Sequence, residues 1–514
     1  MKFSDCVFVL IIILFLSTKT FSQFNDDWMR LPEGLGFSNQ LEYSYNVDNK
    51  IEILENWLNL DYNRNIFSAG LRLEVFQPND PDPSISRGKV RYADIAYKYI
   101  TVDIGDVEAG ISITAGNFYK LFGRGLILKS YEDRNIRVDN NLLGVKVEAN
   151  YLGFSLTALT GSAANSNNER NDILHAIDLQ YNGLDFLKIG STLASNQTDL
   201  DNAERTTLAS FRLQPSYWNF DGYAEYGIKS NNDIQSTVFN DDEWKIGEAF
   251  YGSLNFYYDA FSVVGEYKYY DNYAFTSEDG TIFYNTPPSL RKEYTYQLLN
   301  RHPSPLNQSN EKGYAVEMNY NFSDETSVVA DYGITQTLPK DSYYQRISGL
   351  SLPVVTQLKE VYVQATNNWD ESFMTIAAFG YNEELATNTK NITPILENRF
   401  FFNEINTIKL ILEHQQSKNL TTDEKYYDDV VTLEYLRSPG FSVSVVTEVK
   451  TTEPEESRIV RKVWSFIQFG YKLGNHTDLS LLFGTRQAGN ICIGGICRFE
   501  PAFQGIELKM FTRI

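Results

Sequence analysis

The sequence has little positive charge, few cysteines and no long apolar segment beyond its first residues. Its 514 residues include 45 basic and 66 acidic side chains, which gives a net charge of -21. A chain without a basic excess is a poor partner for nucleic acid, because phosphate binding depends on lysine and arginine. After residue 22 no stretch approaches the length of about 18 apolar residues that a membrane-spanning helix needs. Helical membrane spans are therefore excluded.

The short motifs that mark common catalytic and metal centres are also missing. HExxH, GxSxG and the glycine-rich phosphate-binding loop are absent, and the 4 histidines are scattered without metal-ligand spacing. We therefore expect no catalytic residue, no metal site, no cofactor and no enzymatic activity. A hydrolase whose catalytic residues come from separate strands stays open as an alternative.

The first residues have the composition of an export signal. Lys2 precedes an apolar run over residues 7–16; polar residues follow, and the small side chains of Thr20 and Ser22 stand shortly before Gln23. This order is typical of a secretory signal peptide that is cleaved near Ser22.

Cysteine usage agrees with export. Cys6 lies within the signal, so Cys492 and Cys497 are the only pair in the mature chain. Two neighbouring cysteines in an oxidising compartment favour a disulfide. Gly494 and Gly495 lie between them and suit a turn, so we predict a disulfide across the tip of a hairpin.

Beyond the signal, apolar and polar residues alternate with a period of two. Within residues 315–322, for example, Val316, Met318 and Tyr320 share one face and Glu317 and Asn319 the other. Such alternation predicts strands. The alternating segments run for about 10 to 12 residues, which a tilted strand needs to cross a bilayer, whereas globular strands usually have about five or six.

The connections between these segments alternate between short turns and long polar loops. Residues 63–65 are typical of the first kind, and residues 229–244 and 273–311 of the second. The fold of a soluble β-sandwich does not require this alternation of short and long connections. We therefore predict an all-β fold, a single large antiparallel transmembrane β-barrel of roughly 24 strands (about 22–26), with short periplasmic turns and long extracellular loops.

This architecture sets the expected domains and location. We predict a signal peptide at residues 1–22, a short periplasmic segment at 23–35 and an outer-membrane barrel at 36–514. The partner that the apolar exterior implies is the lipid of the cell outer membrane. Residues 23–35 are too few for a plug domain, which argues against a TonB-dependent transporter.

Residues 117–141 form the most unusual loop, because apolar side chains at 126–128 are unexpected in solvent. In one arrangement, this loop folds into the lumen and narrows or plugs it. The alternative is a loop folded over the barrel mouth, with its charges paired to neighbouring loops. Four basic residues are its candidate site residues: Arg124, Lys129, Arg134 and Arg137.

The longest loop, residues 273–311, combines several prolines with Tyr284, Tyr294 and Tyr296. It could be a surface that docks a partner, or it could act as a lid. Long extracellular loops are also tolerated without a specific role.

Two segments resemble a family of uncharacterised outer-membrane barrels from Bacteroidota. The first carries GNFY at 116–119, FGRGL at 122–126, YEDR at 131–134 and VDN at 138–140; the second carries CIGGICR at 492–498, PAF at 501–503 and GIEL at 505–508. The resemblance implies an outer-membrane location and no known activity. It transfers no catalytic or binding residue.

Three functions are compatible with such a barrel. The first is a loop-gated channel or transporter for a small solute, because a sheet of this size encloses a wide lumen. The second is a non-enzymatic assembly partner that holds a lipoprotein or secreted protein at the outer membrane. The third is the hydrolase mentioned above.

Overall fold

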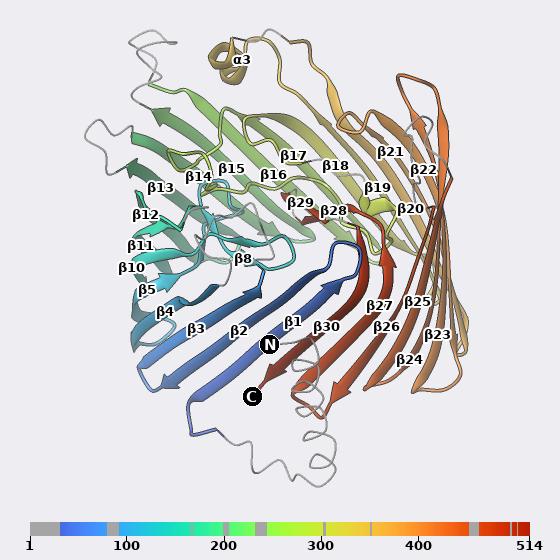
Figure 1. Cartoon of the computed structure of the whole chain (residues 1–514). Helices are drawn as coiled ribbons and strands as arrows, with labels where there is room; N and C mark the ends of the chain where they lie inside the picture. Colours follow the sequence, from blue (N-terminus) through green and yellow to red (C-terminus); the bar gives the residue numbers. More distant parts are fainter. Residues whose placement is uncertain are drawn as a thin grey trace.

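The computed structural model describes residues 31–79, 92–165, 168–198, 205–231, 244–301, 305–349, 352–451, 462–493, 496–500 and 502–514. Its strands join in one 24-stranded antiparallel sheet that closes into a barrel (Figure 1). No helix within these ranges is long and apolar enough to cross a bilayer. The predicted all-β barrel is confirmed.

Most strands of the barrel pair with their immediate neighbours along the chain, as in an up-and-down barrel. In order around the barrel they are β1 (Leu35–Asn46), β2 (Ile51–Arg64), β3 (Phe67–Pro78), β4 (Tyr92–Gly105), β5 (Ala109–Phe118), β10 (Leu142–Tyr151), β11 (Phe154–Ala163), β12 (Asp172–Leu184), β13 (Leu187–Thr198), β14 (Arg205–Tyr217), β15 (Phe220–Asn231), β16 (Gly247–Tyr258), β17 (Phe261–Asp271), β18 (Asn310–Asn321), β19 (Thr326–Gln336), β20 (Thr356–Asp370), β21 (Phe373–Glu384), β22 (Thr389–Phe401), β23 (Asn406–Asn419), β24 (Lys425–Arg437), β25 (Phe441–Lys450), β26 (Val463–Leu473), β27 (Thr477–Arg486) and β30 (Phe503–Arg513).

Small elements lie in the connections between these strands. Three two-stranded sheets join β6 (Lys120–Leu121) to β7 (Lys129–Ser130), β8 (Glu132–Asp133) to β9 (Val138–Asp139) and β28 (Gly489–Ile493) to β29 (Ile496–Glu500). A 3-10 turn, η2 (Leu299–Arg301), and a helix, α3 (Tyr343–Ser348), complete the described elements. Sequence periodicity did not predict them, because each is too short to show a period.

Strand β12 shows how the sequence determines the two faces of the wall. Leu174 and Asp178 are buried on the inner face, whereas Ile173, Ile177 and Leu179 are exposed on the outer face. Since successive side chains of a strand point to opposite sides, the period of two sends polar groups into the lumen and aliphatic groups outward. The apolar exterior then contacts lipid.

The barrel closes where β1 pairs with β30, in register from Ser38 opposite Arg513 to Asn46 opposite Gly505. At Gly505 the two backbones approach so closely that a Cβ atom would lie 1.8 Å from the carbonyl oxygen of Tyr45. Glycine is therefore required at this point of the seam.

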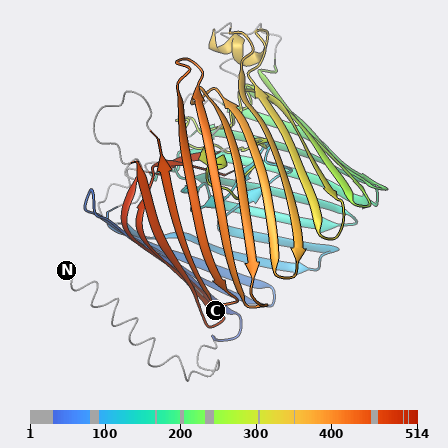
Figure 2. The same ribbon diagram turned by 90° about the vertical axis from the view of Figure 1, so that its right-hand side faces the viewer.

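The two ends of the barrel differ. The start of β1 and the end of β30 share one end, which also carries short turns such as Leu152–Gly153 between β10 and β11. The long connections, including the one that carries α3, leave the other end (Figures 1 and 2). Short periplasmic turns and long extracellular loops are the pattern of bacterial outer-membrane barrels.

We predict that an arginine on the outer face will destabilise the barrel far more than one on the adjacent inner position. Val431 lies at the middle of β24 and is 43% exposed, while Val430 is buried. V431R places a charge in hydrocarbon and should lower the free energy of unfolding by about 2–4 kcal/mol. Urea unfolding of the protein in lipid vesicles measures this value.

The matched control is T432R, which points the same side chain into the lumen. It should cost clearly less than V431R. Equal losses for the two variants would contradict the assignment of the faces.

Candidate functional site

Two long loops pack together and contact the inner face of the barrel. Loop A comprises residues 119–141, between β5 and β10, and loop B comprises residues 272–301 and 305–309, between β17 and β18. Figure 1 shows both loops within the outline of the barrel. They bring together residues that are far apart in the sequence.

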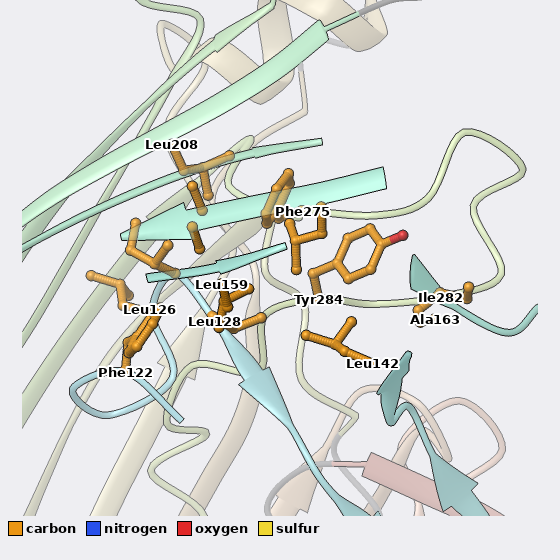
Figure 3. Packing of buried hydrophobic residues seen from close by; sticks show 14 of the residues in the cluster. Phe122, Leu126, Leu128, Leu142, Leu159, Ala163, Leu208, Phe275, Ile282 and Tyr284 are labelled. Atoms are coloured by element: carbon orange, nitrogen blue, oxygen red, sulfur yellow. The ribbon is translucent and has the colours of Figure 1, made fainter. Parts of the chain in front are cut away.

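Apolar side chains of the two loops form one buried cluster against the wall (Figure 3). Leu126, Ile127 and Leu128 of loop A are fully buried, and Phe275 and Tyr284 of loop B pack in the same cluster. Full burial of each large aliphatic side chain stabilises the packing of the loops by about 1.5–3 kcal/mol. The apolar run that was unexpected in a solvated loop thus lies in a dry core.

The backbones of the two loops are also joined by hydrogen bonds. Lys129 N donates to Tyr284 O at 2.8 Å, and Thr286 N donates to Gly125 O at 3.1 Å. Gly125 has a positive φ of 83°, and a Cβ atom there would lie 2.7 Å from Thr286 O. A glycine is needed at 125 because it permits both the turn and the close approach.

Two of the predicted site residues bind the wall formed by β1 and β2. Arg137 donates to both carboxylate oxygens of Glu55, at 2.7 and 2.9 Å. Arg134 donates to Gln40 Oε1 at 2.6 Å, and its guanidinium lies 4.8 Å from the ring centroid of Trp57. Both side chains therefore tie loop A to the inner face of neighbouring strands.

The other two predicted residues lie nearer to aromatic groups. The guanidinium of Arg124 is 5.4 Å from the ring centroid of Tyr223 on β15, and the ammonium of Lys129 is 4.6 Å from that of Tyr131. Burial lowers the pKa of Lys129, and the charge of Asp133 partly opposes this shift. Burial also raises the pKa of Tyr131 to about 12.

Sequence reasoning missed the wall residue at the centre of these contacts, Arg72 of β3. It donates to Glu132 at 2.9 and 3.0 Å and pairs with Glu74 at 3.2 Å and with Asp139 at 3.5 Å. The three carboxylates have oxygen atoms within 4.8 Å of one another, which is close enough to share a cation. The guanidinium of Arg72 supplies that cation, so the group forms an ion-pair network.

Loop B binds a different part of the wall through its segment Tyr294–Arg301. The hydroxyl of Tyr296 donates to Glu397 of β22 at 3.1 Å, and Leu298 N donates to Glu413 of β23 at 2.8 Å. Arg301 pairs with Asp428 of β24 at 2.9 Å and with Glu448 of β25. Burial opposes the charge of Arg301, but its bonds to Glu448 outweigh that effect and raise the pKa of the guanidinium.

A cavity of about 520 Å³ lies beside loop A. Its lining combines Glu74 and Asn117 of the wall with Tyr131, Arg137 and, from loop B, Phe283. Charged, amide and aromatic groups around a concave space suit a small polar solute.

The three described histidines lie on separate strands or turns of the barrel. His414 pairs with Asp429 at 2.6 Å on the exposed side of the wall, and His476 contacts the carbonyl oxygen of Arg513 at a turn. His175 projects outward on β12, opposite in phase to the buried Leu174. No serine hydroxyl is a hydrogen-bond partner of these three within the described ranges, and His302 lies outside them.

The predicted cysteine hairpin is present as the strands β28 and β29. Their register places Cys492 opposite Cys497. The side chains of both residues lie outside the described part of the structure, so the disulfide stays a prediction.

A closed 24-stranded barrel with an aliphatic exterior defines a bacterial outer-membrane β-barrel protein. The chain belongs to the family of unknown function DUF6029, whose sequence profile matches residues 5–514. The expectation of an uncharacterised outer-membrane barrel family is thereby confirmed. No curated protein matches the sequence.

Solved structures with a similar fold include three outer-membrane systems. An E. coli P pilus tip assembly intermediate, PapC-PapD-PapK-PapG, has a TM-score of 0.50 at 9% identity and covers 95% of this chain and 62% of that chain. The copper transporter OprC has a TM-score of 0.47 at 11% identity, covering 94% and 82%. The siderophore receptor PirA from Pseudomonas aeruginosa has a TM-score of 0.44 at 9% identity, covering 94% and 81%. At such identities the likeness concerns the fold alone.

We predict that R137Q will release loop A from β2. The side chain of Glu55 is 7% exposed, so R137Q removes a positive charge from beside a buried carboxylate. A fully buried pair would cost about 3–5 kcal/mol when broken in this way, and partial exposure of Arg137 lowers the expected value. Hydrogen exchange of the amides in loop A should increase, and urea unfolding should report the loss of stability.

The double variant R137Q/E55Q should recover most of the loss, because both charges are then absent. R64Q, at an exposed position at the end of β2, serves as the control and should have no effect. Unchanged exchange of loop A in R137Q would contradict its role as an anchor.

Proposed function

We propose that the protein is a loop-gated channel or transporter of the outer membrane, without enzymatic activity. The observation that carries the proposal is the mutual packing of loops A and B within the barrel. Loop A binds β1, β2, β3 and β15, and loop B binds β20 and β22 to β25. Together they act as the plug of a lumen that would otherwise conduct.

The width of the barrel makes such a plug necessary. Barrels of about 16 to 18 strands already leave an aqueous channel. This barrel has 24 strands. Without internal groups its lumen would be an open aqueous pore.

The attachments of the loops are suited to gating. Each loop continues covalently from two strands and packs apolar side chains against the wall, and its polar contacts with the wall are separate ion pairs and hydrogen bonds. Such contacts can be exchanged for water or for solute groups one at a time. Loss of these polar contacts leaves each loop held by its apolar packing, while the hydrogen-bonded barrel stays closed.

We predict that the wild-type protein conducts rarely in planar lipid bilayers and that R137Q/R301Q opens it. This variant breaks one wall contact of each loop, Arg137 with Glu55 and Arg301 with Glu448 and Asp428. Loss of about 1.4 kcal/mol from the closed state raises the open probability about tenfold. Single-channel recording measures it, with R64Q as the matched control.

Silent bilayers for both the wild type and R137Q/R301Q would overturn the channel proposal. The assembly-partner alternative would then gain support if one lipoprotein or secreted protein copurified with the detergent-solubilised barrel at constant stoichiometry.

The proposal also covers the processing of the chain on export. We propose cleavage after Ser22, a disulfide between Cys492 and Cys497, and a Bacteroidota origin, which the family resemblance implies. The intact mass of the purified protein should equal that of residues 23–514 less two hydrogen atoms, and reduction should restore those atoms. C492S/C497S should lose at most about 2 kcal/mol of stability, because the loop that the disulfide closes is short. Free thiols in the unreduced protein would contradict the disulfide.

A further inference from the structure

A row of buried carboxylates lines the inner face of β22 to β25. We call it the acidic wall and define it by Glu397, Glu413, Asp428 and Glu448, each at most 5% exposed. Glu413 and Glu448 are register partners of the same residue, Val430, from its two neighbouring strands. The wall therefore gathers charges of one sign within one patch.

The segment Tyr294–Arg301 of loop B is bound along this acidic wall as a peptide would be. Glu413 accepts hydrogen bonds from two successive backbone amides, Gln297 N at 3.2 Å and Leu298 N at 2.8 Å. The carbonyl oxygen of Leu298 accepts from Gln415 Nε2 at 3.2 Å. The wall thus recognises both backbone donors and a backbone acceptor.

Arg301 inserts its guanidinium at the end of this segment. It donates to both carboxylate oxygens of Glu448 through its two terminal nitrogens and to Asp428 Oδ2 at 2.9 Å. The planar fork of a guanidinium matches a carboxylate in this two-point manner, and the compact ammonium of lysine does not. The site is therefore shaped for guanidinium.

Among the described residues, the four carboxylates of the acidic wall are accompanied by three cations, Arg301, Arg399 and Lys450. Arg399 pairs with Glu397 at 2.6 Å, and Lys450 is the register partner of Asp428 with its ammonium 5.1 Å from the ring of Tyr426. Glu413 is bonded by neutral backbone amides of loop B.

One carboxylate oxygen of the wall is also left without a partner. Asp428 is 5% exposed, and its Oδ1 accepts no hydrogen bond within the described part of the chain. A buried acceptor without a hydrogen-bond donor destabilises the protein. An additional, positively charged donor at this oxygen would remove that cost.

We propose that the acidic wall is a binding site for guanidinium-bearing oligopeptides, which the segment Tyr294–Arg301 occupies as an internal ligand. This inference rests on the proposed function. It names the class of solute that displaces part of the plug formed by loops A and B. An external basic peptide supplies the same backbone donors and guanidinium, and a second basic residue meets the surplus of carboxylates. Its binding displaces the segment and releases loop B from the wall.

The test measures binding of fluorescein-labelled tri-arginine amide to the full-length protein in detergent by fluorescence anisotropy. R301Q removes the internal guanidinium, so it should bind the probe about tenfold more tightly than the wild type. R301Q/E413Q/E448Q should lose at least that gain. Labelled tri-glutamate should bind none of these proteins.

The matched control is R301Q/E434Q. Glu434 is on the same strand as Asp428, six residues or about 20 Å further along, and pairs with Lys409 at 2.5 Å. It should bind tri-arginine like R301Q. Equal binding by R301Q and the wild type, or by R301Q and R301Q/E413Q/E448Q, would overturn the site.

A measurement on the wild type keeps the test independent of whether the variants fold. Saturating tri-arginine should increase hydrogen exchange at the amides of Gln297 and Leu298, because the segment is displaced. Unchanged exchange at saturation would overturn the proposal. None of these measurements needs ion flow: silent bilayers refute the channel alone, whereas absent binding in a conducting variant refutes the site alone.

Discussion

Backbone N–H and C=O groups inside a bilayer have no water to bond, so each of them needs a partner within the protein. The pairing of β1 with β30 meets this requirement at the only place where the sheet would otherwise have edges. Closure then determines the rest of the molecule. Once every strand has lipid on one side, the period of two sends side chains such as Ile177 outward and side chains such as Asp178 inward.

Closure also leaves carboxylates buried on the inner wall, and the loops supply partners for them. An acidic chain that keeps its exterior apolar must place many carboxylates on the inner wall, where Glu55 and Glu413 are buried. Buried carboxylates require hydrogen bonds or opposite charges. Loop A supplies Arg137 to one of them, and loop B supplies backbone amides to the other. The loops in turn need the wall, since their own run at residues 126–128 would otherwise meet water.

Prediction from the sequence succeeded where the determining signal is local. Strand length, alternation and the rhythm of turns are properties of about ten consecutive residues, and they predict the barrel and its strand number. The apolar run at 126–128 likewise indicated that loop A packs against something. The partners could not be predicted, because the register of a loop against a wall depends on tertiary contacts. Arg72 lies 60 residues from Glu132, and Arg301 lies 147 residues from Glu448.

A plug made of loops differs physically from a separate plug domain in how it can be displaced. The segment Tyr294–Arg301 is tethered at both ends, so it competes with a free solute at an effective concentration on the order of millimolar. A solute shifts the equilibrium only by the difference between its affinities for the open and closed states. A single guanidinium reproduces only part of the internal ligand and competes weakly. A basic peptide adds backbone donors and a second positive charge, and the carboxylates that hold the gate closed then become the first groups that bind the solute.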